Sequence, residues 1–257
     1  MSTKAHGRIL FWEGASLWIL SAPPGARYPK TDPHAHHAIQ VTVALTGRVD
    51  FDLDDGPIGG EGAIVIAPDV THAFEGTGLV AHLFVASDGQ VGRQIMRALL
   101  PHGPTATLPM SALGDLPARL RATFEDPHHE VDDLKELGRA LVARLTGEAP
   151  RLTLRDPRIQ KTIAWVSDRL HEEVSLDDVA ALVRLSPGRA RHLFVQETGL
   201  PFRTFVLWLR LTRALERFAS GASLTDAAHD AGFSDSAHLS RTFRRMFGIA
   251  AASLRLS

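Results

Sequence analysis

The sequence predicts an α+β protein of two domains: an N-terminal antiparallel β-barrel with trailing helices, and a C-terminal all-α domain. Three observations support this fold class. Short apolar runs broken by glycine and proline fill the first third of the 257 residues. From about Gly89 onward the apolar residues recur at helical spacing. Near the C-terminus a two-helix pattern occurs twice, at an offset of 48 residues.

The charge distribution also indicates two domains with different partners. Residues 1–154 carry a net charge of −5 and nine of the 13 histidines, whereas residues 155–257 carry +4. The predicted boundaries are 1–88 for the barrel, 89–147 for a helical dimerisation or connecting region, 148–157 for a linker and 158–257 for the repeat-containing domain.

Composition excludes several classes of protein. The chain has no cysteine, which excludes a disulfide scaffold, a thiolate zinc site and a cysteine nucleophile. It has no apolar run long enough to span a membrane and no secretory leader, so we expect a cytoplasmic protein without membrane partners. Arginine outnumbers lysine 24 to 4, and arginine is the better fork for phosphate and guanine.

Five apolar runs are predicted as strands, with turn residues such as Pro23-Pro24-Gly25, Asp54–Pro57 and Gly59-Gly60 between them. Many short strands at close spacing favour a small antiparallel barrel or sandwich. The predicted strands are Leu17–Ser21, Ala38–Leu45, Arg48–Leu53, Ala63–Ile66 and Val80–Val85.

Histidines cluster at one point in this region. On a strand His34 and His36 share a face, and Gln40 shares it if the strand continues. With Gly47 and a later His72, this spacing resembles the two cupin motifs, in which a His-x-His pair, an acidic residue and a later histidine hold a divalent metal inside the barrel. The resemblance implies a cupin-like barrel.

The resemblance also implies a metal site formed by His34, His36, Gln40 and His72, suited to Zn, Ni or Fe. Gln40 replaces the usual glutamate, which removes a charged oxygen and weakens metal binding. The alternative is that these side chains line an effector pocket or hydrogen-bond one another. We interpret His37 as a rim residue and His82 as a strand-face residue.

The middle of the chain is predicted to be helical. Leucines spaced at three and four mark a helix from about Val131, which ends at Gly147. These helices either close the end of the barrel or pair with a second subunit in a homodimer.

The C-terminal repeat predicts two helix-turn-helix units. Ser175-Leu176-Asp177-Asp178 is matched by Ser223-Leu224-Thr225-Asp226, and each serine is placed to cap a helix. Second helices open at Ser186-Pro187 and at Ser234-Asp235. A long helix from Phe202 to about Ser220 joins the units. It carries a basic stripe in which at least one member is a candidate phosphate contact: Arg203, Arg210, Arg213 and Arg217.

This tandem repeat resembles the AraC/XylS transcriptional regulators over about 95 residues. Ala231-Gly232-Phe233-Ser234, the run His238–Phe243 and Phe247-Gly248 carry the resemblance. The final Pro-x-x-Tyr of the family is replaced by Ala251–Leu254. The resemblance implies sequence-specific binding to promoter DNA, a possible contact with RNA polymerase, and an N-terminal effector and dimerisation module.

A recognition helix reads base edges in the major groove with residues near its N-terminus, and two such helices enter successive grooves roughly 34 Å apart. The family pattern places Arg191 and Arg241 where a guanidinium can grip a guanine. Arg244 and Arg245 are candidate phosphate contacts. The remaining DNA-binding candidates are Gly188, His192, Ser236, Ala237 and Ser240.

The sequence thus predicts a non-enzymatic transcription regulator that senses a small molecule or a divalent metal through its barrel. The alternative is a metal-dependent cupin enzyme, an oxygenase or isomerase, with a DNA-binding domain. An enzyme needs a general acid or base beside the metal, and no such carboxylate is evident, although Asp50, Asp52 and Glu75 lie in the barrel segment. A third possibility is a barrel that only dimerises.

Overall fold

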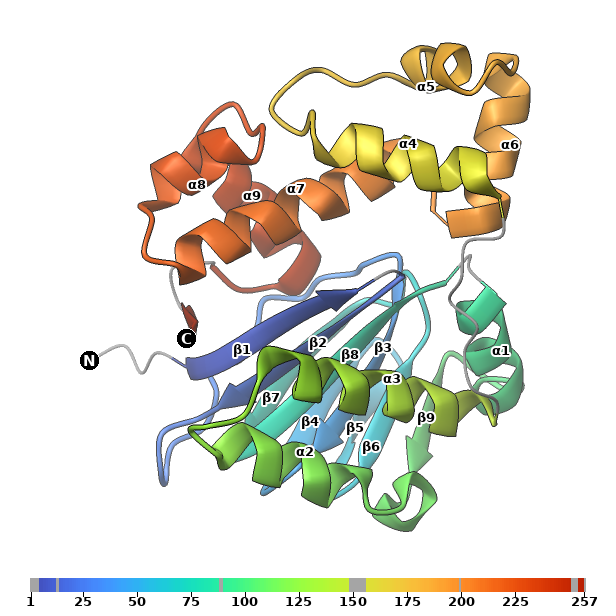
Figure 1. Ribbon diagram of the computed structural model, residues 1–257. Coiled ribbons are helices and arrows are strands. Elements are labelled where there is room, and N and C mark those ends of the chain that lie inside the picture. The colour runs from blue at the N-terminus through green and yellow to red at the C-terminus, as the bar shows by residue number, and fades with distance from the viewer. Residues whose placement is uncertain are drawn as a thin grey trace. The chain divides into compact units, whose positions relative to one another are not determined.

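The computed structural model describes residues 5–12, 14–87, 90–147, 156–198, 200–250 and 254–256 (Figure 1). The described chain divides into two compact units. Unit 1 holds the residues up to Ser87, those from Val91 to Gly147 and those from Phe243 onward. Unit 2 holds Gln90 and the residues from Asp156 to Thr242. The division therefore falls inside the last helix, between Thr242 and Phe243. Most of the predicted linker, 148–157, lies outside the described residues.

Two sheets form the core of unit 1. The larger has the order β10-β1-β2-β8-β3-β6-β9, antiparallel except where β10 pairs in parallel with β1. The smaller has the order β5-β4-β7. The larger sheet comprises β1 Ala5–Trp12, β2 Ala15–Ser21, β3 Ala38–Ala44, β6 Ala63–Ile66, β8 Leu79–Ala86, β9 Thr105–Leu108 and β10 Leu254–Leu256, and the smaller β4 Arg48–Leu53, β5 Gly56–Gly60 and β7 His72–Thr77.

The two-domain α+β class is confirmed, with one correction. The strands form two sheets and not one closed barrel. A segment from Arg27 to His34 runs along the outer edge of β7, where isolated bridges join Arg27 to Thr77 and His34 to His72. His34 and His36 therefore lie in this segment and the loop after it, before β3 begins, and not on a regular strand as predicted.

All five predicted strands are present, and every residue of β3 is buried. The expected turn at Gly59-Gly60 is wrong, because these glycines end β5, which pairs with β4 across the Asp54-Asp55 turn. The structure has five further strands that were not predicted: β1, β5, β7, β9 and β10. In β5 the glycines and proline have low strand propensity, and pairing with β4 overrides it.

The helices of unit 1 are α1 Gln90–Leu99, the 3₁₀ helix η1 Met110–Leu113, α2 Leu116–Glu125 and α3 Val131–Thr146. The apolar stripe of α3 packs on β1 and β2, and Leu134 and Leu141 are fully buried there. Gly138 has no room for a Cβ because the indole of Trp12 lies against it. The α3 stripe is thus covered within one chain, and Gly147 ends the helix with φ of 72° as predicted. A homodimer stays a prediction.

Unit 2 is helical, with α4 Pro157–Ser167, α5 Leu176–Leu182, α6 Pro187–Thr198, α7 Phe202–Ala219, α8 Leu224–Asp230 and the start of α9 Ser236–Phe247. The long α7 lies between the helix pair α5–α6 and the helix α8 (Figure 1). The side chains of Phe194, Phe202 and Val206 form its core with those of α4 and α5. Among the described residues no helix is long and apolar enough to cross a membrane.

Candidate functional site

The first helix-turn-helix consists of α5 and α6. Ser175 precedes α5, and its Oγ accepts a hydrogen bond from Asp178 N at 3.2 Å, while the Asp178 carboxylate accepts one from Ser175 N at 2.9 Å. This reciprocal capping box satisfies free amides at the helix start, as predicted. After α5 the chain turns at Arg184, whose φ is 54°, and Leu185 N donates to Ala180 O at 2.9 Å.

The second helix-turn-helix, α8 and α9, has the same backbone plan. Ser223 Oγ accepts from Asp226 N at 3.1 Å, and the turn residue Gly232 has φ of 78°. Phe233 N then donates to Ala228 O at 2.9 Å. The Asp235 carboxylate caps α9 by accepting from His238 N at 2.6 Å. These hydrogen bonds hold the pKa of the Asp235 carboxyl below its usual range.

The predicted DNA-binding residues lie on the outer sides of α6 and α9. The opposite sides are buried through Ala190, Phe194, Leu239 and Phe243. The exposed residues are Gly188, Arg191, His192, Ala237, Arg241, Arg244 and Arg245, and the half-buried ones are Ser236 and Ser240. This placement leaves the predicted readers at the surface, and their contacts with bases stay a prediction.

The predicted arginine stripe on α7 divides into two kinds of residue. Arg210 donates from Nε to Leu170 O at 3.0 Å and from its NH2 nitrogen to Glu172 O at 2.8 Å, so it fastens the chain after α4 to α7. Burial lowers the pKa of this guanidinium. Arg217 pairs with Asp230, while Arg203 and Arg213 are exposed. Arg210 therefore has a structural role that its sequence position did not reveal.

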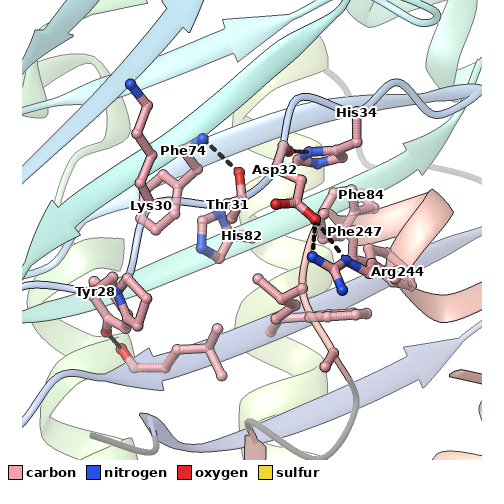
Figure 2. A pocket seen from close by; sticks show the side chains of 16 residues that line it. Tyr28, Lys30, Thr31, Asp32, His34, Phe74, His82, Phe84, Arg244 and Phe247 are labelled. Atoms are coloured by element: carbon pink, nitrogen blue, oxygen red, sulfur yellow. Dashed lines mark hydrogen bonds and ion pairs between the residues drawn. The ribbon is translucent and has the colours of Figure 1, made fainter. Parts of the chain in front are cut away.

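A pocket in unit 1 brings together five segments of the chain (Figure 2). Its volume is about 300 Å³. Aromatic rings form most of its wall, and charged groups lie at its side. The lining comprises Trp18, Leu20, Tyr28, Pro29, Lys30, Thr31, Asp32, His34, Phe74, His82, Phe84, Arg244, Phe247, Gly248, Ile249 and Ala250.

Sequence reasoning missed this pocket, except for His34 and Arg244. Its aromatic residues come from β2, the segment from Arg27 to His34, β7, β8 and the end of α9, so no local spacing links them. Phe247 lies 4.1 Å from Trp18 and 5.5 Å from Phe84, measured between ring centroids. Arg244 forms an ion pair with Asp32, at 2.6 Å from Nε and 2.5 Å from its NH2 nitrogen.

Next to this pocket the predicted histidines converge. His34, His36 and His72 place one ring nitrogen each within 4.8 Å of one another. Each Nδ1 faces a backbone carbonyl: Asp32 O at 2.8 Å, Ala38 O at 3.0 Å and Val70 O at 2.8 Å, respectively. A neutral ring that donates from Nδ1 leaves its Nε2 as an acceptor or a metal ligand.

Burial keeps these rings uncharged. It lowers the pKa of His34 and His36, and it lowers the pKa of His72 to about 3 with help from the neighbouring imidazoles. Burial lowers the pKa of His82 to about 3, and the Nδ1 atom of His82 lies 2.9 Å from Thr42 Oγ1. His82 is thus on a strand face, as expected.

Gln40, the fourth predicted ligand, lies between the rings of His36 and His72. Its Oε1 is 2.8 Å from His36 Nε2 and 3.1 Å from His72 Nε2. Three acceptors facing one another repel, so this orientation of the amide suits a cation between them. With the amide turned over, its NH2 group donates to both rings, and the oxygen faces Thr42 Oγ1. The first orientation is satisfied only with a cation between the acceptors, and the second is satisfied without one.

Comparison with known proteins shows which proteins these features resemble. A helix-turn-helix domain model matches residues 179–257. The transcriptional activator RhaS of Klebsiella pneumoniae is 26% identical over 95% of this chain and 94% of its own length. RhaS of Escherichia coli O157:H7 is 37% identical, over 38% of this chain and about a third of its own length.

Two solved structures of ToxT from Vibrio cholerae share the fold. An apo form has a TM-score of 0.50 at 11% identity and covers 95% of this chain and 97% of that one. Another has a TM-score of 0.50 at 12% identity and covers 93% and 96%, respectively. With its two helix-turn-helix units behind a sheet-rich N-terminal domain, the chain is similar to the AraC family of DNA-binding transcriptional regulators.

Proposed function

We propose that this regulator responds to a small-molecule effector bound in the pocket of unit 1. The observation that carries the proposal is the position of the pocket lining. Part of that lining, Arg244 and the run from Phe247 to Ala250, directly follows the predicted reading face of α9. A ligand in this pocket contacts the chain that leads out of a recognition helix. An effector shifts a regulator only when it binds one arrangement more tightly than another.

The pocket has the features of a small-ligand site. Its volume of about 300 Å³ is at the lower end of the usual range. Trp18, Phe74 and Phe84 supply apolar surface, while Lys30 and His34 supply polar groups that can orient a ligand. We therefore expect a compact, partly aromatic effector with a polar or charged end.

We propose that α6 and α9 read promoter DNA through Arg191 and Arg241, with Arg245 on a phosphate. The exposure of these side chains supports the assignment. Because the curated relatives are transcriptional activators, we also propose that this chain activates transcription, as a homodimer in contact with RNA polymerase. The same relatives favour a regulator over a cupin enzyme.

The effector proposal is tested by thermal shift with a small-molecule library. A ligand that binds the folded state raises Tm with its concentration. Ala250→Trp fills the pocket and should abolish the shift. Ala118→Trp, at an exposed site on α2, should leave it unchanged. A ligand whose shift survives Ala250→Trp binds elsewhere and contradicts the proposal.

As a second candidate function, we propose that His34, His36, Gln40 and His72 hold one divalent metal, with Zn, Ni or Fe as the expected ions. The Nδ1 atom of each of the three histidines faces a backbone carbonyl oxygen, which is the usual outer hydrogen bond of a histidine ligand and leaves Nε2 as the atom that binds a metal. The metal would then serve as the effector or as a support for the pocket.

Elemental analysis of protein purified without chelator tests this site. The expected result is near-stoichiometric metal that is lost in both His34→Ala and His72→Ala and retained in His102→Ala, whose histidine is exposed. Gln40→Glu should tighten binding by adding a charged oxygen. Wild-type protein that takes up no Zn, Ni or Fe after reconstitution would exclude the metal and leave the turned-over amide as the arrangement of Gln40.

A further inference from the structure

We propose that the carboxylate of Asp32 competes with DNA for the guanidinium of Arg244 within the same chain. The proposal rests on the proposed DNA binding and adds a regulatory contact to it. Arg244, near the end of α9, can form an ion pair either with the carboxylate of Asp32 or with a DNA phosphate. When Asp32 holds it, the chain makes one phosphate contact fewer.

The geometry of the ion pair supports this competition. The Nε atom of Arg244 lies 2.6 Å from Asp32 Oδ2, and one NH2 nitrogen of Arg244 lies 2.5 Å from the same oxygen. A phosphate binds to the same fork of donors, so it must displace the carboxylate. The pair lies at the surface, with 61% and 52% of the two side chains exposed, and is therefore open to exchange with a phosphate from solution.

Surface ion pairs are usually weak because two flexible side chains must be ordered to form them. Here the backbone around both residues is already fixed. Asp32 N donates to Gly248 O at 2.9 Å. Gly248 has φ of 66°, and a Cβ there would overlap His34 Nδ1 and Asp32 O. This close fit holds the end of α9 beside Asp32 before the ion pair forms.

Aromatic packing fixes the same segment from the other side. The rings of Trp18 and Phe243 are stacked at 5.8 Å with an interplanar angle of 18°, and the ring of Phe247 is 4.1 Å from Trp18. Figure 2 shows Asp32 and Arg244 joined at the side of the pocket that Phe247 and Phe84 line. The ion pair is therefore placed where a pocket ligand would contact it.

Phosphate contacts do not depend on sequence, so the test needs no known operator. We would measure binding to a random-sequence duplex of about 30 base pairs by fluorescence anisotropy over a range of salt concentrations. Asp32→Asn keeps the shape of the side chain and removes its charge. It should increase the steepness of log affinity against log salt by about 0.9 and tighten binding roughly five-fold near 0.1 M salt.

Two controls separate competition from a general loss of negative charge. Asp52→Asn removes an equally exposed carboxylate that pairs with Lys30, and it should leave the salt slope unchanged. In an Arg244→Ala background, Asp32→Asn should have no further effect. Arg245→Ala should weaken binding whether or not Asp32 is present.

The outcomes distinguish this inference from the proposed function. If Asp32→Asn matches wild type in affinity and slope while Arg245→Ala weakens binding, the competition does not exist and DNA binding stands. If Asp52→Asn tightens binding as much as Asp32→Asn, the effect is general charge and the inference is overturned. If no variant binds duplex at any salt concentration, both fail. Circular dichroism melting of each variant confirms that it is folded.

Discussion

The two helix-turn-helix units have the same backbone plan but not the same residues. Each begins at a serine cap, and each turns through one residue of positive φ, 48 positions apart: Arg184 in the first unit and Gly232 in the second. At Gly232 a Cβ would overlap the carbonyl oxygen of Leu170. The turn itself therefore tolerates a side chain, and only close packing against Leu170, just after α4, demands glycine.

The units also differ in how their second helices end. α6 ends at Thr198 within unit 2, whereas α9 continues past Thr242 into unit 1. The first reading face is therefore supported by helices alone. The second reading face is continuous with residues that line the pocket. We therefore expect an effector to change the phosphate contacts of the second unit and not those of the first.

Gly232→Ala should have the largest effect on stability. The substitution puts a Cβ in the left-handed region and against Leu170 O, so we expect a loss of about 3 kcal/mol. The equivalent change in the first unit, Arg184→Ala, should alter stability by less than about 0.5 kcal/mol because a Cβ is already accommodated there. Urea denaturation measures both, and equal losses would contradict the comparison.

The two proposed guanine contacts should be separable on DNA. Once binding sequences have been selected from a random library, Arg241→Ala should cost about 1–3 kcal/mol and relax specificity at one base, and Arg191→Ala should do so at a base about one helical turn away. Arg158→Ala, whose guanidinium pairs with Asp156, serves as the control. If Arg241→Ala weakened binding equally on every sequence, Arg241 would contact phosphate instead.

The helix caps should contribute less. Ser175→Ala and Ser223→Ala each remove a side-chain acceptor from a helix start and should cost about 1 kcal/mol. Each serine also donates from Oγ to the carboxylate of its own cap, Ser175 to Asp178 at 2.5 Å and Ser223 to Asp226 at 2.6 Å, so we expect the two losses to be similar. Thermal denaturation of the two variants side by side measures both losses, and a loss at only one of the two caps would contradict this expectation.

Low pH should weaken the cap that Ser175 and Asp178 form at the start of α5. Hydrogen bonds from Ser175 hold the pKa of Asp178 below its usual range. A carboxyl whose pKa is lowered by folding stabilises the protein above its unfolded pKa, and that stability is lost as pH falls through the folded pKa. Asp178→Asn should therefore flatten this part of the pH dependence of Tm, and an unchanged acid limb would contradict the assignment.

The smallest expected effect is a gain in stability. Arg184→Gly relieves the cost of positive φ but increases the entropy of the unfolded chain. The two terms nearly cancel, so we expect a stabilisation of about 0.5 kcal/mol. A loss of stability would mean that the Arg184 side chain makes contacts that the turn needs.

Most of the helical domain could be predicted because its signals are local. Caps such as Ser175 and Ser223, and turns such as Gly232, act within a few residues of themselves. The sheets were predicted less completely. β7 was missed because His72–Thr77 reads as a mixed polar run, and its pairing with β4 and with the segment from Arg27 to His34 comes from tertiary structure.

The candidate sites show the same limit. The His-x-His spacing correctly indicated that His34, His36, Gln40 and His72 lie together. The pocket could not be predicted, because Trp18, Phe84 and Phe247 are brought together only by folding. For the same reason Arg210 and Arg244 looked alike in sequence, although one is fastened to carbonyl oxygens and the other to Asp32.

The parallel pairing of β10 with β1 has a consequence for solubility. An uncovered edge strand offers unpaired amides and carbonyls to other chains and is a site of aggregation. The last strand of this chain covers that edge of the larger sheet along Ala5 to Gly7. A fragment shortened at its C-terminus should therefore retain its core and yet associate edge to edge, so that trimming for crystallisation produces soluble aggregates.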